Sequence, residues 1–277
     1  MTTSVPDLLV TAPDGAPIAA FRSGRVDGPP LLLVHGASAD HTTFRVLGPL
    51  LADTFDLYAI DRRGRGASGD VLPYAIEREF EDIAAVAIAV SDRCGVASVD
   101  VFGHSYGGRC ALGAALETDR IRRVISYEGA PAAPGERYGD APLAGELAKL
   151  AVAGRLETLL ETFMTRVVGM SGADLAAYRA DPIWPRRVAA AGTIARELAV
   201  EAVDAAGLDR LGAVHQPVLQ LLGGDSLPGF AAATWALDEC LADGRVVVMP
   251  GARHAAHHTH PAAMAAAILA FLGPVAV

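Results

Sequence analysis

The chain has 277 residues, of which 52% are hydrophobic and 20% are charged. This composition is typical of a globular protein with a large core and excludes an intrinsically disordered chain. The net charge of -9 argues against nucleic acid and anionic membrane surfaces as partners, because like charges repel.

The first residues show no recognisable targeting segment. The stretch MTTSVPDLLVTAPDG has neither a basic start nor a continuous apolar run, so no secretory signal is expected. The longest apolar stretches are shorter than the roughly 20 residues that a membrane helix needs. We therefore expect a cytoplasmic protein that does not enter a membrane. The sequence does not indicate its oligomeric state.

Three cysteines, Cys94, Cys110 and Cys240, are widely spaced and form no C-x-x-C pair. This spacing argues against a zinc site or a redox pair. We interpret all three as small hydrophobic core residues in a reducing compartment.

Short apolar runs alternate with longer helical patterns over most of the chain. Residues 8–21 predict a hairpin, because the sequence Pro-Asp-Gly supplies a turn between two extended pieces. Six further strand candidates each lead into Gly, Pro or polar residues: 29–36, 55–61, 98–105, 122–129, 217–224 and 244–251. The alternation predicts an α/β fold with a mostly parallel central sheet and helices on both faces. Sites in such folds lie at the carboxyl ends of the strands.

The alternation stops between residues 131 and 211, where helical apolar spacing continues without a convincing strand. We therefore predict a core formed by residues 1–130 and 212–277, with residues 131–211 inserted as a helical cap over the strand ends. Large side chains at helical spacing are most often core residues. Four of them are nevertheless candidates to line a pocket: Tyr138, Phe163, Met164 and, as the predicted substrate contact, Trp184.

A G-x-S-x-G motif, Gly103-His104-Ser105-Tyr106-Gly107, follows an apolar run and precedes a helical pattern. This is the context of a nucleophile elbow, in which a strained turn between strand and helix exposes the serine hydroxyl. The helix that follows offers free N–H groups and a partial positive charge to a developing oxyanion. We predict that Ser105 is the nucleophile and that His104 is a packing residue.

With this motif the chain resembles the α/β-hydrolase superfamily over nearly its whole length. LLLVHGAS is similar to the H-G loop after the third strand of those enzymes, and DRRGRGAS to their glycine-rich loop after the fourth. The resemblance implies an oxyanion hole formed by the backbone N–H groups of Ala37 and Tyr106, and no cofactor. We interpret Arg62, Arg63 and Arg65 in the second loop as solvated rather than anion-binding.

Eight histidines could supply the base that a serine nucleophile needs. His254 follows the last predicted strand, which is where the superfamily carries its base. His257, His258 and His260 follow closely, but no carboxylate or cysteine joins them at ligand spacing, so we expect no metal site.

Two acids are candidates for the carboxylate that orients the histidine. Asp225 follows the seventh strand, where many α/β hydrolases place it, but Ser226 occupies the expected position in the motif. Glu128 ends the sixth strand, and this part of the chain resembles the fungal zearalenone lactonases, also in the R-I-R sequence that leads into the strand. The chain order Ser105, Glu128, His254 keeps the order Ser, acid, His. We predict Glu128, with Asp225 and a pairing of Glu128 with an arginine as alternatives.

These residues predict acyl transfer to water through a covalent serine ester, with His254 as general base and acid. The expected substrate is a neutral, hydrophobic carboxylic ester or lactone, because an apolar cap and an H-G-A loop without a strong cation would form the pocket. Two alternatives stay open. One is a C–C bond hydrolase of a β-diketone-type substrate, and the other is a non-catalytic ligand-binding relative.

Overall fold

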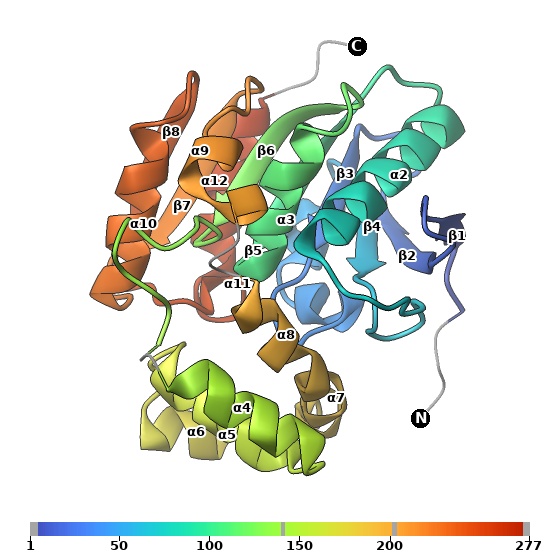
Figure 1. Ribbon diagram of the computed structural model, residues 1–277. Helices are drawn as coiled ribbons and strands as arrows, with labels where there is room; N and C mark the ends of the chain where they lie inside the picture. The colour runs from blue at the N-terminus through green and yellow to red at the C-terminus, as the bar shows by residue number, and fades with distance from the viewer. Residues whose placement is uncertain (1–4, 140–141, 201–203, 274–277) are drawn as a thin grey trace.

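The computed structural model describes residues 5–139, 142–200 and 204–273 of the chain. The predicted cap therefore includes residues 140–141 and 201–203, which lie outside the described residues, as does the start of the chain, residues 1–4. An eight-stranded sheet has the order β1-β2-β4-β3-β5-β6-β7-β8 (Figure 1). Its strands are β1 Leu8–Thr11, β2 Pro17–Gly24, β3 Pro30–Val34, β4 Asp56–Asp61, β5 Val99–His104, β6 Ile121–Tyr127, β7 Val218–Gly223 and β8 Gly244–Met249.

The pairing of the strands confirms the predicted α/β class. The pair β1–β2 is antiparallel, as the predicted hairpin requires, and the pair β2–β4 is antiparallel as well. All other neighbouring pairs, from β4–β3 to β7–β8, are parallel. The carboxyl ends of β3 to β8 therefore meet at one edge of the sheet.

Both faces of the sheet are covered, and β3 shows how the sequence achieves this. All five residues of β3 are buried. Leu32 and Val34 join one apolar cluster, whereas Leu31 and Leu33 join the cluster on the other face. Strands that are buried on both faces are expected to be apolar throughout, and this is typical of parallel sheets.

Helices from different parts of the chain complete these two clusters. The first cluster includes residues of α2 (Ile76–Cys94), α3 (Tyr106–Ala115), α9 (Leu208–Leu211) and α10 (Pro228–Asp238). The second includes residues of η1 (His41–Arg45), α1 (Gly48–Leu51), α11 (Ala256–Thr259) and α12 (Pro261–Leu272). No described helix is long and apolar enough to cross a membrane.

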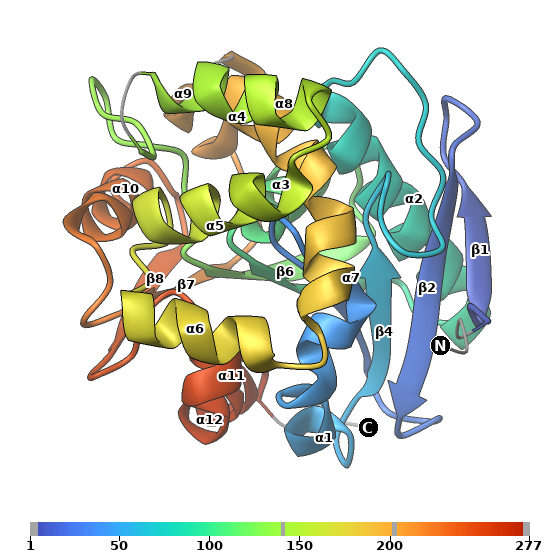
Figure 2. The same cartoon turned by 90° about the horizontal axis from the view of Figure 1, so that it is seen from below.

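Short helices without any described strand lie between β6 and β7. They gather at the carboxyl end of the sheet (Figures 1 and 2), where they form an apolar cluster of their own. They are α4 Leu143–Val152, α5 Leu156–Arg166, α6 Gly172–Ala180, α7 Trp184–Ala190, η2 Ala191–Thr193 and α8 Ile194–Ala199. The next elements, η3 (Asp204–Ala206) and α9, contribute Ala206 and Leu211 to the core cluster on α2 and α3 instead. The exact cap boundaries remain a prediction.

The three cysteines differ in environment. Cys110 is buried in the core, Cys94 is half-buried and Cys240 is exposed, and all three are free thiols. The interpretation of Cys240 as a core residue is wrong, because this thiol follows the end of α10 at the surface.

The interpretation of Arg62, Arg63 and Arg65 as solvated is also wrong, since their exposed fractions are 1%, 0% and 2%. Each guanidinium is compensated by carboxylates from other elements. Arg63 donates from Nε and Nη2 to Asp82 on α2, both at 2.7 Å, and from Nη1 to Asp14 at 2.9 Å. Such pairing is what allows a charge to be buried.

The other two arginines join the core to the cap. Arg62 donates to both carboxylate oxygens of Glu79 on α2, at 3.0 and 3.1 Å. Arg62 and Arg65 also both contact Glu197, which lies on cap helix α8. Burial raises the pKa of Glu79, but the two arginines outweigh burial, and the net pKa is lowered. This four-residue network is a buried charged contact between α8 and the loop after β4.

Glu197→Gln should destabilise the protein strongly. Arg62 and Arg65 would then share the single negative charge of Glu79, and removing one partner of a buried ion pair costs about 3 to 5 kcal/mol. We expect a fall of this size in the free energy of unfolding, measured by urea titration with circular dichroism.

The matched control is Glu146→Gln, which removes the charge of another cap glutamate. Glu146 pairs with Arg166 at 2.5 Å, but both side chains are substantially exposed, at 48% and 33%. An exposed pair contributes about 1 kcal/mol or less. Equal losses in the two variants would contradict the assignment of a stabilising contact to Glu197.

Candidate active site

The turn between β5 and α3 carries the serine of the G-x-S-x-G motif. Ser105 has φ of 55° and ψ of -128°, a strained conformation for a residue with a side chain. A Cβ atom at Gly103 would lie 2.4 Å from the Gly107 carbonyl oxygen, and one at Gly107 would lie 2.3 Å from that of His35. Both positions therefore require glycine, and the turn that they permit points the serine hydroxyl out of the backbone.

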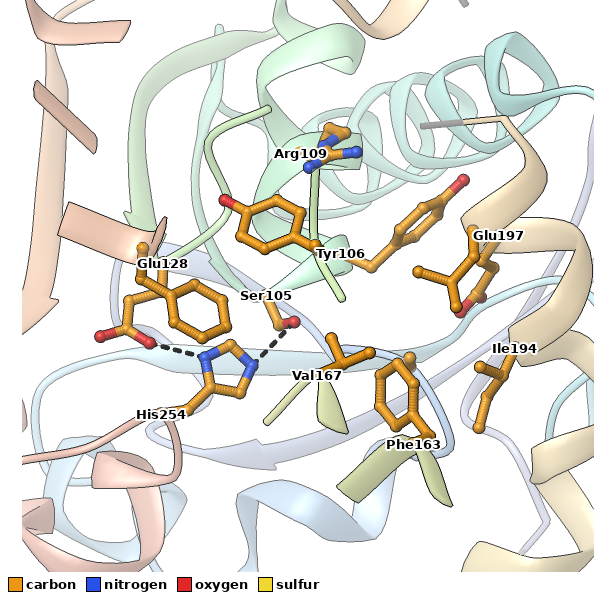
Figure 3. A pocket seen from close by; sticks show the side chains of 13 residues that line it. Ser105, Tyr106, Arg109, Glu128, Phe163, Val167, Ile194, Glu197 and His254 are labelled. Atoms are coloured by element: carbon orange, nitrogen blue, oxygen red, sulfur yellow. Dashed lines mark hydrogen bonds and ion pairs between the residues drawn. The ribbon is translucent and has the colours of Figure 1, made fainter. Parts of the chain in front are cut away.

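Ser105, His254 and Glu128 form a chain of two hydrogen bonds (Figure 3). The distance from His254 Nε2 to Ser105 Oγ is 3.0 Å, and that from His254 Nδ1 to Glu128 Oε2 is 2.6 Å. An ionised carboxylate only accepts hydrogen bonds, so Nδ1 carries the proton. Nε2 is left to accept the proton of the serine hydroxyl.

The carboxylate of Glu128 is buried, and neighbouring donors compensate it. Glu128 follows β6 with φ of 49°. Its Oε1 atom accepts from the backbone N–H of Gly223 at 2.8 Å and from the Ser226 hydroxyl at 2.5 Å. With His254 on Oε2, both oxygens have partners. Ser226 stands where the sequence motif would place an acid, and here it donates to the acid of the neighbouring strand.

The alternatives considered for the acid are placed elsewhere. Asp225 is exposed, and its backbone N–H donates to Ala252 at 2.9 Å. Arg122 and Arg123 both pair with Asp100, at 2.6 and 2.8 Å. The structure therefore places Glu128, and not Asp225, against the histidine.

Aromatic rings and a backbone contact hold His254 in position. The ring of Phe230 stacks on that of His254 with 4.4 Å between centroids and 23° between planes. His104 donates from Nε2 to the His254 carbonyl oxygen at 2.8 Å. Burial, followed by the neighbouring His254, holds the pKa of His104 well below its usual range. His104 is thus a neutral residue that supports the loop after β8.

Ala37 and Tyr106 lie beside the serine, as the predicted oxyanion hole requires. A Cβ atom at Gly36 would lie 3.0 Å from Ser105 Cβ, so the loop after β3 passes in contact with the nucleophile. Tyr106 is the first residue of α3, where backbone N–H groups have no partner within the helix. The role of the two N–H groups as an oxyanion hole remains a prediction.

Two cavities meet at Ser105 and His254, with Ala37 and Phe163 also shared between them. The smaller one, of about 30 Å³, lies between Tyr106, Arg109 and Glu197 and is drawn in Figure 3. The larger one, of about 860 Å³, lies between the cap and the loop after β8. A volume of this size suits a small-molecule substrate.

The larger cavity has an apolar wall and a polar wall. The apolar wall comes from the cap and consists of Phe163, Met164, Val168 and Met170. The polar wall includes Thr43, Asp174, Asp181, His257, His258 and three arginines, Arg45, Arg187 and Arg253. The H-G-A loop supplies no cation to this cavity, but the cap contributes Arg187, so the expectation of an apolar cap is wrong at this residue. Neither periodicity nor a motif marks Arg187 in the sequence as a pocket residue. The signal that the sequence offers is the adjacent basic pair Arg186-Arg187 in an otherwise apolar cap.

The predicted pocket residues have different positions. Phe163 lines both cavities, Met164 lines the larger one and Tyr138 lines the smaller one. Trp184 lies in the apolar cluster of the cap, where its indole N–H donates to Glu157 at 3.0 Å. It lines neither of these two cavities of the described chain, so its position does not support a substrate contact. Its ring packs against Tyr178 within the cap instead.

The histidines behind His254 pack against one another. The ring centroids of His257 lie 4.1 Å from His104 and 4.0 Å from His258. Within residues 5–139, 142–200 and 204–273, no group of three His, Cys, Asp or Glu residues could hold a metal ion. Burial lowers the pKa of His258 to about 4. These rings are neutral packing groups near neutral pH.

The family model described as "Alpha/beta hydrolase family" matches residues 31–267. N-formylmaleamate deformylase of Pseudomonas putida is 32% identical over 154 residues, which cover 54% of this chain. The chain spans only about half, 51%, of the length of that relative.

Solved structures are similar over nearly the whole chain. An alpha/beta hydrolase from Sphaerobacter thermophilus is 32% identical with a TM-score of 0.81, and 96% of this chain and 100% of that chain are covered. The enol-lactonase from Burkholderia xenovorans LB400 is 21% identical with a TM-score of 0.77, and 96% and 99% are covered. The second likeness shows the fold alone.

His257→Gln should weaken the pH dependence of stability. Burial, and then the neighbouring His104, His258, His254 and Arg187, hold the pKa of His257 well below its usual range. As the pH falls below about 6.5, this histidine takes up a proton in the unfolded state but not in the folded state, so acid destabilises the protein. We expect the fall in the free energy of unfolding from about pH 7.5 to about pH 5.5 to be about 1.4 kcal/mol smaller in the variant than in the wild type.

The measurement is urea unfolding at a series of pH values. The control is His215→Gln, which makes the same substitution at an exposed ring, so that a change of slope specific to His257→Gln can be assigned to burial. If His257→Gln keeps the full wild-type slope, His257 is not held neutral by its surroundings.

Proposed function

The chain belongs to the alpha/beta hydrolase family, and we propose that this hydrolase cleaves a carboxylic ester or lactone through an acyl-enzyme intermediate. The observation that supports this most directly is the pair of hydrogen bonds from Ser105 through His254 to Glu128. A serine hydroxyl is a weak nucleophile until a positioned base takes its proton, and this arrangement supplies the base.

The proposed reaction has two halves. In the first, His254 Nε2 takes the proton of Ser105, Oγ attacks the carbonyl carbon, and the N–H groups of Ala37 and Tyr106 stabilise the oxyanion. The imidazolium, stabilised by Glu128, then donates its proton to the leaving oxygen. In the second half, a water molecule gives its proton to His254 and attacks the acyl-enzyme, and the serine recovers its proton as the acid is released.

The position of the acid supports a lactone as one form of the substrate. Glu128 follows β6, which is the position that the resemblance to the zearalenone lactonases implies, and Ser226 stands at the usual place after β7. The apolar wall with Phe163, Met164 and Val168 suits the hydrophobic part of such a substrate. A cytoplasmic location remains a prediction from the sequence.

Labelling with a fluorophosphonate probe tests the nucleophile. The wild type should be labelled, and Ser105→Ala should not. A panel of p-nitrophenyl esters, macrolactones and β-diketones then tests the reaction, with turnover of esters or lactones expected. A wild-type protein that is not labelled would support the non-catalytic alternative, and turnover of β-diketones alone would support C–C bond hydrolysis.

Glu128→Gln should lower kcat by about 10³- to 10⁴-fold, because the neutral amide neither stabilises the imidazolium nor fixes the tautomer of His254. The measurement is steady-state turnover of the best substrate of the panel. Asp225→Asn is the matched control, and since Asp225 is exposed we expect a change within about twofold. A loss of orders of magnitude in Asp225→Asn but not in Glu128→Gln would overturn the assignment of the acid.

A further inference from the structure

Arg187 on α7 is a buried cation in the wall of the larger cavity. Only 2% of its side chain is exposed, and it lines the same cavity as Ser105 and His254. Its Nη1 atom is buried and has no hydrogen-bond partner within the described part of the chain. A buried donor without a partner is costly, so this position calls for a ligand or another explanation.

The neighbouring carboxylate, that of Asp40, already has other hydrogen-bond donors. Asp40 Oδ1 lies 3.7 Å from Arg187 Nη1, which is beyond hydrogen-bonding distance. The other oxygen of Asp40 accepts from Arg186 Nε at 2.9 Å and Nη2 at 2.6 Å, while Oδ1 accepts from the backbone N–H of Thr42 at 3.0 Å. One carboxylate thus faces two guanidinium groups, and a positive charge remains at Arg187.

The other groups around the cavity do not remove this charge. Arg45 and Asp181 pair with each other at 3.2 Å. His257 and His258 are neutral near pH 7, because burial lowers the pKa of each ring. Asp174 is exposed and accepts from Ser171 at the start of α6.

We propose that Arg187 binds a carboxylate group of the substrate, so that the substrate is a monoanion carrying an ester or lactone and, across an apolar spacer, one carboxylate. A guanidinium offers two parallel donors that match the two oxygens of a carboxylate. Arg45 and Asp181 pair with each other, and the exposed Asp174 and Arg253 have opposite charges. The charged residues that line the cavity thus leave one positive charge, which disfavours a dianion. The spacer would lie along Phe163 and Met164. This inference rests on the proposed function, and it replaces the expected neutral substrate by a singly charged one.

Paired substrates test the inference. One set of substrates consists of the p-nitrophenyl half-esters of adipate, suberate and sebacate. Each half-ester is compared with the p-nitrophenyl ester of the monocarboxylic acid that has the same number of carbons. For the best spacer we expect kcat/KM of the wild type to be about 10- to 100-fold higher for the half-ester, the usual contribution of a charge-assisted hydrogen bond. In Arg187→Met this ratio should fall to about one.

The control is Arg179→Met on cap helix α6. Arg179 pairs with Glu157 and Glu161, does not contact Asp40 and does not line the cavity, so its variant should keep the preference for half-esters. Active sites are titrated with an uncharged fluorophosphonate, which removes any misfolded fraction from the comparison. Equal kcat/KM values for the paired substrates in the wild type at every spacer length, or an equal loss of preference in both variants, would overturn the inference.

Binding separates this inference from the proposed function. Suberate and its uncharged diamide are titrated calorimetrically into Ser105→Ala and into Ser105→Ala with Arg187→Lys. We expect suberate to bind at least about tenfold more tightly than the diamide. Suberate should bind more weakly when lysine replaces Arg187, because the two parallel donors of the guanidinium are lost. This result would support the inference even if no ester were hydrolysed, whereas equal binding of the two compounds would contradict it even in an active esterase.

Discussion

The short hydrogen bond between Glu128 and His254 is the interaction on which the rest of the site depends. A buried carboxylate requires donors, and this one takes them from the backbone at the end of β7, from a serine in the loop after β7 and from the histidine after β8. A single negative charge therefore ties together the ends of three neighbouring parallel strands. This arrangement orients the imidazole of His254 toward Ser105, which the strained turn after β5 holds in place.

Buried charges in three parts of the molecule differ in how they are compensated. Glu128 is compensated within the site. Arg62 and Arg65 are compensated by one glutamate of the core and one of the cap, so their burial links the two parts of the fold. Arg187 lies 3.7 Å from the carboxylate of Asp40, which already pairs with Arg186. This difference is what distinguishes a structural cation from one that is available to a ligand.

The fold could be predicted from the sequence because its signals are local. Apolar runs that end in Gly or polar residues mark parallel strands, and the G-x-S-x-G motif marks the turn after β5. The sequence also favoured Glu128 over Asp225, because the one-residue shift that places Ser226 in the motif is visible in the chain. The structure brings Ser105, Glu128 and His254 together, while their chemical roles stay predictions. What the sequence could not provide were contacts between distant residues. Arg62 looked solvated, since nothing near it in the chain shows that Glu79 and Glu197 surround it.

The position of Glu197 bears on how molecules reach the serine. Lifting α8 away from the core would separate Glu197 from two buried guanidinium groups, which is a costly step. The larger cavity, in contrast, already reaches the surface at exposed residues such as Ser171, Arg253 and Thr259. A path from the surface to Ser105 therefore exists while α8 stays in contact with the core.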